Sequence, residues 1–259
     1  MKGWLVYDAA GAQKNQWYIA KLQREAKKFG GELELKIQEN LRVLNEKLPD
    51  FAIVRTICPH LNKELETRGL RVFNNAKTAE IACDKYKTYE HCKAWGIPVL
   101  PTWRVGEKEE YPCVMKTVDG HGGAEVFWVE NGAQAKAIEK SGGRYICQQP
   151  NGILGRDMRV YAIGGKIVGA VLRSAENDFR SNFSLGGSVT ATKVDEPQKA
   201  IVKKLYETLQ FDYVGIDFLP TTEGWVLNEI EDSAGARMLY QTTDTDIAEL
   251  FIRHVFACL

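Results

Sequence analysis

The chain has 259 residues, of which 44% are hydrophobic, enough for one large or two modest domains with a packed core. Its 34 basic and 34 acidic residues cancel, which excludes a bulk attraction to nucleic acid or to an anionic membrane surface. No apolar run forms a signal peptide or approaches the roughly 20 residues that span a bilayer, and six scattered cysteines without metal-ligand spacing indicate a reducing compartment, so we expect a soluble, cytoplasmic protein.

Strand and helix patterns alternate over roughly the first 80 residues. Short apolar or alternating runs predict four strands, at 3–8, 32–37, 51–55 and 71–74. Asn15 is a candidate N-cap for a helix that ends at Gly30–Gly31. This order predicts a small parallel α/β sheet.

The rest of the chain has a different pattern of predicted helices and strands. Residues 76–96 predict one helix that stops at Gly96, and strand-turn-strand patterns follow it. The Gly164–Gly165 pair predicts a tight hairpin between two long strands. Two amphipathic helices are predicted at 196–211 and 245–259. This part of the chain is therefore expected to be α+β, with antiparallel sheet.

Lys116 ends an apolar strand and is followed by a loop with three glycines. Glycines let backbone N–H groups approach phosphate oxygens closely, so residues 116–123 are a candidate phosphate site, although the P-loop pattern is absent. A plain glycine hairpin whose lysine reaches solvent explains the pattern equally well. His121 has no partner histidine at ligand spacing and is interpreted as a polar loop residue.

Arg159 and Arg173 fall on opposite arms of the predicted glycine hairpin, in otherwise apolar strands. Together with Arg180 and Asn182 they form a candidate clamp for an anion, because the guanidinium fork matches phosphate and carboxylate oxygens. The alternative is that each arginine points outward into solvent.

Three acids form the last candidate site. Glu229 and Glu231 are two residues apart and so point to the same face of a strand, and a hairpin places Asp217 on the neighbouring strand. Oxygen donors without histidine or cysteine suit a hard cation such as Mg²⁺ that is shared with substrate phosphates. The alternative is a solvated strand end. Asp232 faces the other way and is interpreted as a turn residue.

The order of these elements resembles the ATP-grasp superfamily and, within it, the RimK-like carboxylate–amine ligases. The resemblance covers about Asp84 to Gly235, and "FRSN…GG" is its most specific part. The matching segments are "DKYKTYEHCKAWGIPVLPTW", "CVMKTVDGHGGAEVFWV", "ICQQPNG…GRDMRVYAIGGKIVGAVLR", "FRSNFSLGG", "VGIDFL" and "VLNEIEDSAG". It implies an N-terminal preATP-grasp α/β domain over 1–83 and an ATP-grasp domain over 84–259, divided into a lid and central subdomain at about 84–150 and a C-terminal catalytic subdomain at 151–259.

The resemblance also implies a role for each matching residue. Lys85 and Lys116 would bind ATP, and the backbone at Gln148–Gln149 would read the adenine edge. The loop that would close over the triphosphate contains Gly120, His121, Gly122 and Gly123. The catalytic residues would be Arg159, Arg173 and Asn182. The ligands of two Mg²⁺ ions, with Mn²⁺ as the alternative metal, would be Asp217, Glu229 and Glu231.

The implied activity is an ATP- and Mg²⁺-dependent ligation of a carboxylate to an amine through an acyl phosphate. Two alternatives stay open: a degenerate ATP-grasp protein that only binds nucleotide, and an ATP-grasp kinase that acts on a non-carboxylate acceptor. Two departures from the family pattern bear on them. Gln149 stands where an acid usually holds the ribose, and Glu231 stands where the metal motif usually has asparagine.

The substrates are not determined by the sequence. By family analogy, the segments that contain Asn15 and Arg237 face the acceptor site, and Arg180 is a further candidate substrate contact. For Arg237 an ordinary surface salt bridge is the alternative. A small molecule, a peptide or a carrier protein each remains open as the substrate, as does a homo-oligomer, because relatives are often dimers or tetramers.

Overall fold

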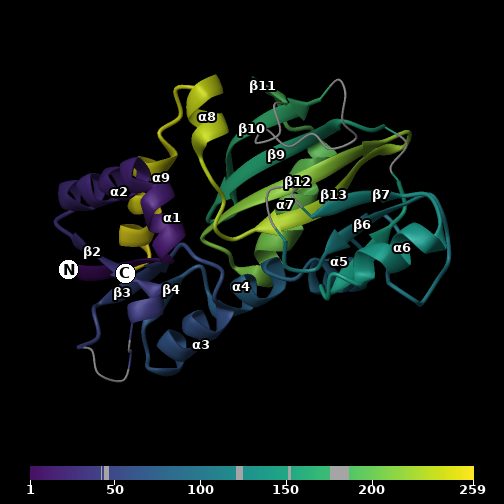
Figure 1. The fold of residues 1–259 in the computed structure, drawn as a ribbon. Helices are drawn as coiled ribbons and strands as arrows, with labels where there is room; N and C mark the ends of the chain where they lie inside the picture. Colours follow the sequence, from purple (N-terminus) through teal and green to yellow (C-terminus); the bar gives the residue numbers. More distant parts are fainter. Residues whose placement is uncertain (42, 44–46, 121–124, 151–152, 176–186) are drawn as a thin grey trace.

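The computed structural model describes residues 1–41, 43, 47–120, 125–150, 153–175 and 187–259, which form three β-sheets with helices around them (Figure 1). In this part of the chain no helix has the length and apolar character needed to cross a membrane.

The first sheet along the chain is a four-stranded parallel sheet in the order β2-β1-β3-β4, as predicted. Its strands are β1 (Lys2–Tyr7), β2 (Glu32–Ile37), β3 (Phe51–Val54) and β4 (Arg71–Phe73). The connecting segments contain α1 (Ala9–Lys14), α2 (Gln16–Lys28), the 3₁₀ turn η1 (Gln38–Asn40) and α3 (Pro59–Thr67).

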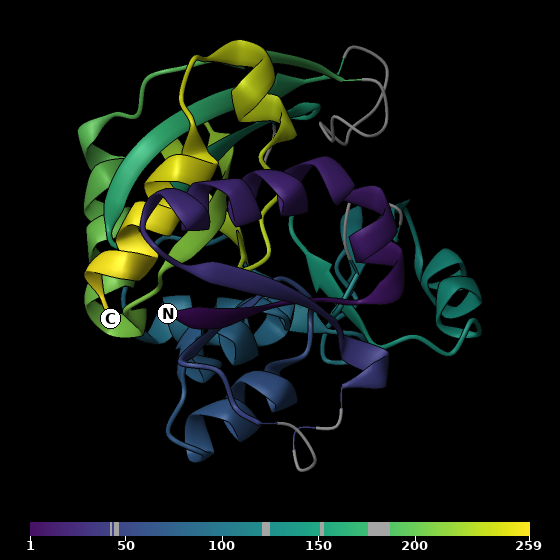
Figure 2. The same cartoon turned by 90° about the vertical axis from the view of Figure 1, so that its left-hand side faces the viewer.

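Helices cover both faces of this sheet because its strand residues alternate between them. Leu5 and Ile53 pack in one core cluster with residues of α2, whereas Val6 and Val54 pack in another with residues of α3. The last helix of the chain, α9 (Ile247–Ala257), returns to the first face and lies beside α2 (Figure 2). The two ends of the chain therefore share one core.

The single helix predicted at 76–96 is two helices, α4 (Ala76–Ala82) and α5 (Lys85–Ala94). The break occurs because the Asp84 side chain accepts a hydrogen bond from the backbone N–H of Lys87 and so caps a new helix. The predicted stop is confirmed, since Gly96 has a φ of 65° and ends α5. Asn15 precedes α2 as predicted, but its side chain donates to the Gly11 carbonyl instead of capping α2.

A five-stranded antiparallel sheet follows, in the order β11-β10-β9-β12-β13. Its strands are β9 (Arg156–Ile163), β10 (Lys166–Ser174), β11 (Ser188–Ala191), β12 (Tyr213–Thr221) and β13 (Gly224–Glu231). The predicted hairpin is confirmed: Gly164 and Gly165 join β9 to β10 with φ values of 53° and 76°.

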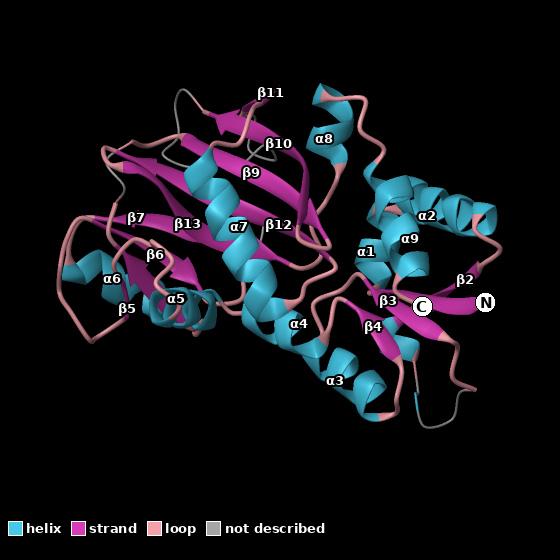
Figure 3. Ribbon diagram, turned by 180° about the vertical axis from the view of Figure 1, so that it is seen from behind, coloured by secondary structure: helices cyan, strands magenta, loops and turns pink. Residues whose placement is uncertain are grey.

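The alternation of side chains gives this sheet two different faces. Val160, Ile216 and Ile230 pack in the core cluster that contains α7 (Glu196–Leu209), which crosses one face (Figure 3). Because neighbouring residues point the other way, Arg159 and Asp217 lie on the opposite face. The register aligns Arg159 with Asp217, and Asp217 with Glu229, across three adjacent strands.

A smaller antiparallel sheet, in the order β5-β8-β6-β7, lies beside β13 (Figures 1 and 3). It consists of β5 (Thr102–Arg104), β6 (Cys113–Thr117), β7 (Val126–Val129) and β8 (Tyr145–Gln148), with α6 (Gly132–Glu139) packed on it. The remaining helix is α8 (Arg237–Thr242), which lies over β10 and β11.

Candidate active site

Arg159 binds two of the three predicted metal ligands on the open face of the five-stranded sheet. Its Nη2 donates to Asp217 Oδ2 at 2.6 Å and to Glu231 Oε1 at 2.5 Å, and its Nη1 donates to Glu231 Oε2 at 2.6 Å. Both Arg159 and Asp217 are buried, with 4% exposure each. The structure thus brings predicted catalytic and metal-binding residues into one site.

Arg173 completes this site from β10. Its Nε and Nη2 donate to the two carboxylate oxygens of Asp157, and its Nη2 also donates to Asp217 Oδ2 at 2.7 Å. Arg173 Nη1 forms no hydrogen bond with a described residue. We call these five residues, Arg159, Arg173, Asp157, Asp217 and Glu231, the reaction-centre network.

The charges of this network stabilise one another. Burial alone would raise the pKa of Asp217, but Arg159 and Arg173 hold it well below its usual value. Burial alone would lower the pKa of Arg159, and Asp217 and Glu231 hold it well above its usual value. Asp217 is therefore an anion and Arg159 a cation throughout the physiological pH range.

Glu229 stands at the edge of the network with weaker compensation. The nearest cation among the described residues is Lys85, whose Nζ lies 3.5 Å from Glu229 Oε1. Burial, together with the charges of Glu231 and Asp217, raises the pKa of Glu229 despite this lysine. The acid trio (Asp217, Glu229 and Glu231) offers only oxygen donors, the ligand type that a hard cation such as Mg²⁺ prefers. The ligand oxygens of these three described side chains do not all lie within 4.8 Å of one another. The donor type therefore fits Mg²⁺, but the spacing does not gather all three acids around one ion.

Lys116 lies between the small sheet and β13. Its Nζ donates to Gln148 Oε1 at 2.6 Å and to Asn228 Oδ1 at 2.9 Å, and the side chain is 8% exposed. Burial lowers the pKa of Lys116 to about 8, although Glu229 opposes this shift. Both contacts are neutral, so the ammonium group has no direct anionic partner among the described residues.

Lys85 joins the glycine loop to the acid trio. Its Nζ donates to the carbonyl oxygen of Gly120, and the same nitrogen faces Glu229. A Cβ on Gly120 would come within 1.9 Å of Thr117 Oγ1, so no larger residue fits there without a shift. The other predicted loop residues, His121, Gly122 and Gly123, lie outside the described part of the chain, as do Arg180 and Asn182.

The predicted adenine-binding strand ends beside β5. Gln148 is buried and holds Lys116, while its amide nitrogen lies 3.3 Å from Thr102 Oγ1. The backbone N–H of Gln149 donates to the Pro101 carbonyl oxygen at 2.9 Å. That N–H is consequently engaged within the protein.

A cavity of about 480 Å³ opens onto the reaction-centre network. Arg159, Arg173 and Glu231 form part of its wall, and the predicted substrate residues Asn15 and Arg237 line it as well. Arg237 is exposed and makes no ion pair within the described residues; its Nη2 donates to the carbonyl oxygen of Lys14 at 3.0 Å. Residues from both ends of the chain thus meet the central hairpins at one cavity.

Sequence reasoning missed several residues of this site. Asp157 precedes Arg159 by two residues and so shares its face, a periodicity signal that was available. Asn228 and the cavity-lining Arg55 carried no local signal. Asp232, interpreted as a turn residue, is 7% exposed and lines the cavity, and burial raises its pKa to about 7.

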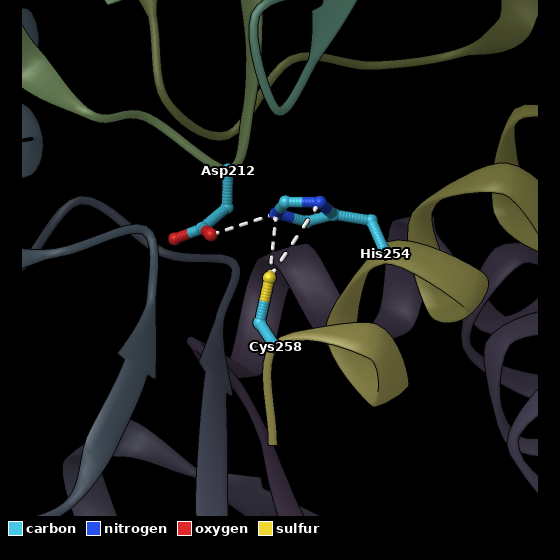
Figure 4. A group of neighbouring side chains, drawn as sticks. All are labelled: Asp212, His254 and Cys258. Carbon is cyan, nitrogen blue, oxygen red and sulfur yellow. Dashed lines mark hydrogen bonds and ion pairs between the residues drawn. The ribbon is translucent and has the colours of Figure 1, made fainter.

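A second group of ionisable side chains lies away from this cavity (Figure 4). His254 Nε2 lies 2.9 Å from Asp212 Oδ1, and Cys258 Sγ lies 3.8 Å from the His254 ring nitrogens. Arg71 Nη2 donates to the same Asp212 oxygen at 2.5 Å. These four residues, the Asp212 network, join β4, the start of β12 and α9. Because a guanidinium already binds the buried Asp212 carboxylate, we interpret the group as structural.

The arrangement of the three sheets is that of the ATP-grasp fold. A RimK domain ATP-grasp protein from Sphaerobacter thermophilus superposes with a TM-score of 0.75 at 19% identity, covering 99% of this chain and 100% of that one. This similarity confirms the expected fold.

The model of the RimK-like ATP-grasp domain matches residues 104–255, more than half of the chain, so the chain belongs to this family. It is 26% identical to a probable alpha-L-glutamate ligase of Histophilus somni, over 92% of this chain and 86% of that protein. It is also 26% identical to the glutamate–LysW ligase ArgX of Sulfurisphaera tokodaii, over 86% of this chain and 90% of that protein. Family membership confirms the expected enzyme class, an ATP-dependent carboxylate–amine ligase.

Proposed function

We propose that the protein forms an amide bond at the reaction-centre network through an acyl phosphate. The observation that carries this proposal is the placement of Arg159 and Arg173, held by buried carboxylates, on the wall of a cavity that both ends of the chain also line. The reaction separates into two displacements. A carboxylate oxygen takes the γ-phosphoryl group of ATP and ADP leaves; an amine nitrogen then attacks the acyl carbon, loses a proton, and phosphate leaves.

The arginines are proposed to orient the reacting anions. Arg159 is held rigidly by two carboxylates, so its main contribution is to fix the positions of Asp217 and Glu231. Arg173 Nη1 forms no hydrogen bond with a described residue, and this nitrogen is the group that we assign to the reacting carboxylate or phosphate. Asn182 is retained as a third catalytic residue on the family resemblance alone.

Nucleotide binding is assigned to the two lysines and the strand between them. Among the described residues Lys116 donates only to neutral amide oxygens, so it is suited to bind an anionic phosphate, and Lys85 lies between Gly120 and Glu229. Gly120 and the loop residues His121, Gly122 and Gly123 are proposed to cover the triphosphate. Gln148 and Gln149 are proposed to flank the adenine.

The acid trio is proposed to hold Mg²⁺, two ions on the family pattern, with Mn²⁺ as the alternative. When bound, the metal would neutralise phosphate charge during transfer. Glu229 is the first choice as a ligand, since its carboxylate has a raised pKa and pairs with a single lysine 3.5 Å away among the described residues. The second Mg²⁺ ion rests on the family pattern alone, because both carboxylate oxygens of Glu231 already bind Arg159.

The substrates are proposed to belong to the amino-acid class, on the names of the glutamate-ligating relatives. The alternative substrate under the same proposal is a carrier protein or peptide that presents the reacting carboxylate. A cytoplasmic location agrees with the need for ATP.

The test is the release of ADP and phosphate by the purified protein with ATP and Mg²⁺. We expect release to rise only when an acid and an amine are both supplied, for example L-glutamate with a panel of peptides and carboxylates. Release that needs only a non-carboxylate acceptor would favour a kinase. Nucleotide binding without ADP formation in any mixture would contradict both enzymes and favour a binding protein.

A further inference from the structure

Arg55 brings a buried positive charge to the same cavity from the parallel sheet. The residue follows β3, lines the cavity and is 7% exposed. Its Nη2 donates to the Ala234 carbonyl oxygen at 2.6 Å, and its guanidinium lies 4.9 Å from the ring centre of Tyr213 and 5.7 Å from that of Tyr18. These three contacts are with uncharged groups, and the Tyr7 side chain is a further hydrogen-bond partner of the guanidinium.

No described residue supplies the opposite charge directly. Within the described residues, no carboxylate oxygen lies within 4.0 Å of the Arg55 nitrogens. Burial raises the pKa of Tyr18 well above its usual value and that of Tyr213 to about 12, so both hydroxyls are neutral. Asp232 is close enough for Arg55 to lower its pKa, but burial is the larger effect on that group. Arg55 differs in this respect from Arg159 and Arg173.

Polar atoms beside Arg55 are also without partners. Arg55 Nε and Ser233 Oγ are buried and form no hydrogen bond with any described residue, and both residues line the cavity. An unpaired buried donor costs free energy that a ligand oxygen recovers. Basic residues outnumber acidic residues on the cavity wall, where Lys14, Arg55, Arg159, Arg173 and Arg237 face Glu231 and Asp232.

We propose that Arg55 anchors a substrate carboxylate that does not react, while the reacting group lies at Arg173. This inference rests on the proposed ligase function and adds a requirement to it: one substrate carries a second anionic group. A carboxylate is the favoured anion because the planar guanidinium can donate to its two oxygens side by side. The group has two sources, an α-amino acid that serves as the amine and a dicarboxylate that serves as the acid.

Paired probes that differ by one carboxylate distinguish these sources. L-Glutamate and its α-amide test the amine substrate, and succinate and its monoamide test the acid substrate. Binding of each to the full-length protein is measured by calorimetry with Mg²⁺ and a non-hydrolysable ATP analogue present. We expect the carboxylate member of one pair to bind roughly 10- to 100-fold more tightly, the range of a charge-assisted hydrogen bond.

The variant Arg55→Met is expected to abolish that preference while leaving the binding of the amide member unchanged. Arg55→Lys should retain part of it, because a lysine keeps the charge but not the planar fork. Arg253→Met, which removes an exposed arginine from α9, is the matched control and should keep the full preference.

Binding of the ATP analogue reports on folding and on the proposed function separately. If Arg55→Met fails to bind the analogue, the comparison is made with Arg55→Lys. Wild-type protein that shows no carboxylate preference in either pair, or an Arg55→Met protein that keeps it, would overturn the role of Arg55. Wild-type protein that binds no analogue and releases no ADP would instead overturn the ligase function.

Discussion

The reaction-centre network and the Asp212 network each surround a buried carboxylate, but they differ in what lies around them. The first lies on one face of a sheet, lines a cavity, and contains carboxylates that share two arginines. The second joins three separate elements: His254 lies against one oxygen of Asp212 (Figure 4), and Arg71 donates to the same oxygen. Similar residue types thus line a cavity in one place and hold elements together in the other.

The largest effect is expected where the reaction-centre network loses its central cation. Arg159→Met leaves the buried Asp217 and the partly buried Glu231 beside each other without their shared partner, and removing one member of a buried ion pair costs about 3–5 kcal/mol. We expect that loss in urea unfolding, together with loss of ADP release. A stability change below about 1 kcal/mol would show that the carboxylates do not depend on Arg159.

Glu229→Gln tests chemistry at the edge of the same network without creating a cavity. We expect turnover to fall about 10³-fold, because losing one preorganised electrostatic partner of the transition state has this order of effect. The unfolding midpoint should stay near that of the wild type. Glu223→Gln, the same change in the exposed turn of the β12–β13 hairpin, is the control and should be fully active. Near-full Mg²⁺-dependent activity of Glu229→Gln would contradict its assignment as a metal ligand.

Asp212→Asn breaks the other network. It removes the charge that binds Arg71 and His254, so we expect a loss of roughly 1.5–3 kcal/mol of stability. ADP release at a temperature where the variant is folded should remain close to the wild-type rate. Glu207→Gln, in an exposed pair with Lys203, should change stability by less than about 1 kcal/mol. A selective loss of activity in Asp212→Asn would mean that this network is more than structural.

The smallest expected effect is on the pH dependence of nucleotide binding. The Lys116 pKa of about 8 means that the unliganded protein loses this positive charge as the pH rises from 8 to 10. Affinity for the ATP analogue should therefore weaken with rising pH, by at most about tenfold per pH unit. Lys116→Arg, whose charge persists, should remove most of the dependence. A flat wild-type profile would show that Lys116 does not contact phosphate.

The central hairpins were predictable because their signals are local. Gly164–Gly165 fixes a two-residue turn, and the period of two places Arg159 beside Asp217 once the strands pair. The break before Lys85 was missed because the apolar pattern continues across it while the Asp84 cap interrupts the backbone.

The cavity residues of the first sheet could not be predicted in the same way. Arg55 and Ala234 are 179 residues apart, and only the packing of the two sheets brings them into contact. Asp232 looks like a turn residue in sequence, but burial at this junction raises its pKa. Sequence periodicity identifies which face a residue occupies, whereas the partner of that face depends on tertiary packing.

The most direct test of the proposed chemistry follows an oxygen atom. The acid that supports ADP release is labelled with ¹⁸O in its carboxylate, and the phosphate formed with ATP, Mg²⁺ and the amine is examined by mass spectrometry. An acyl phosphate transfers one carboxylate oxygen to phosphate, so we predict one ¹⁸O in each phosphate released. Unlabelled phosphate, with both labelled oxygens kept in the acid or its product, would contradict it.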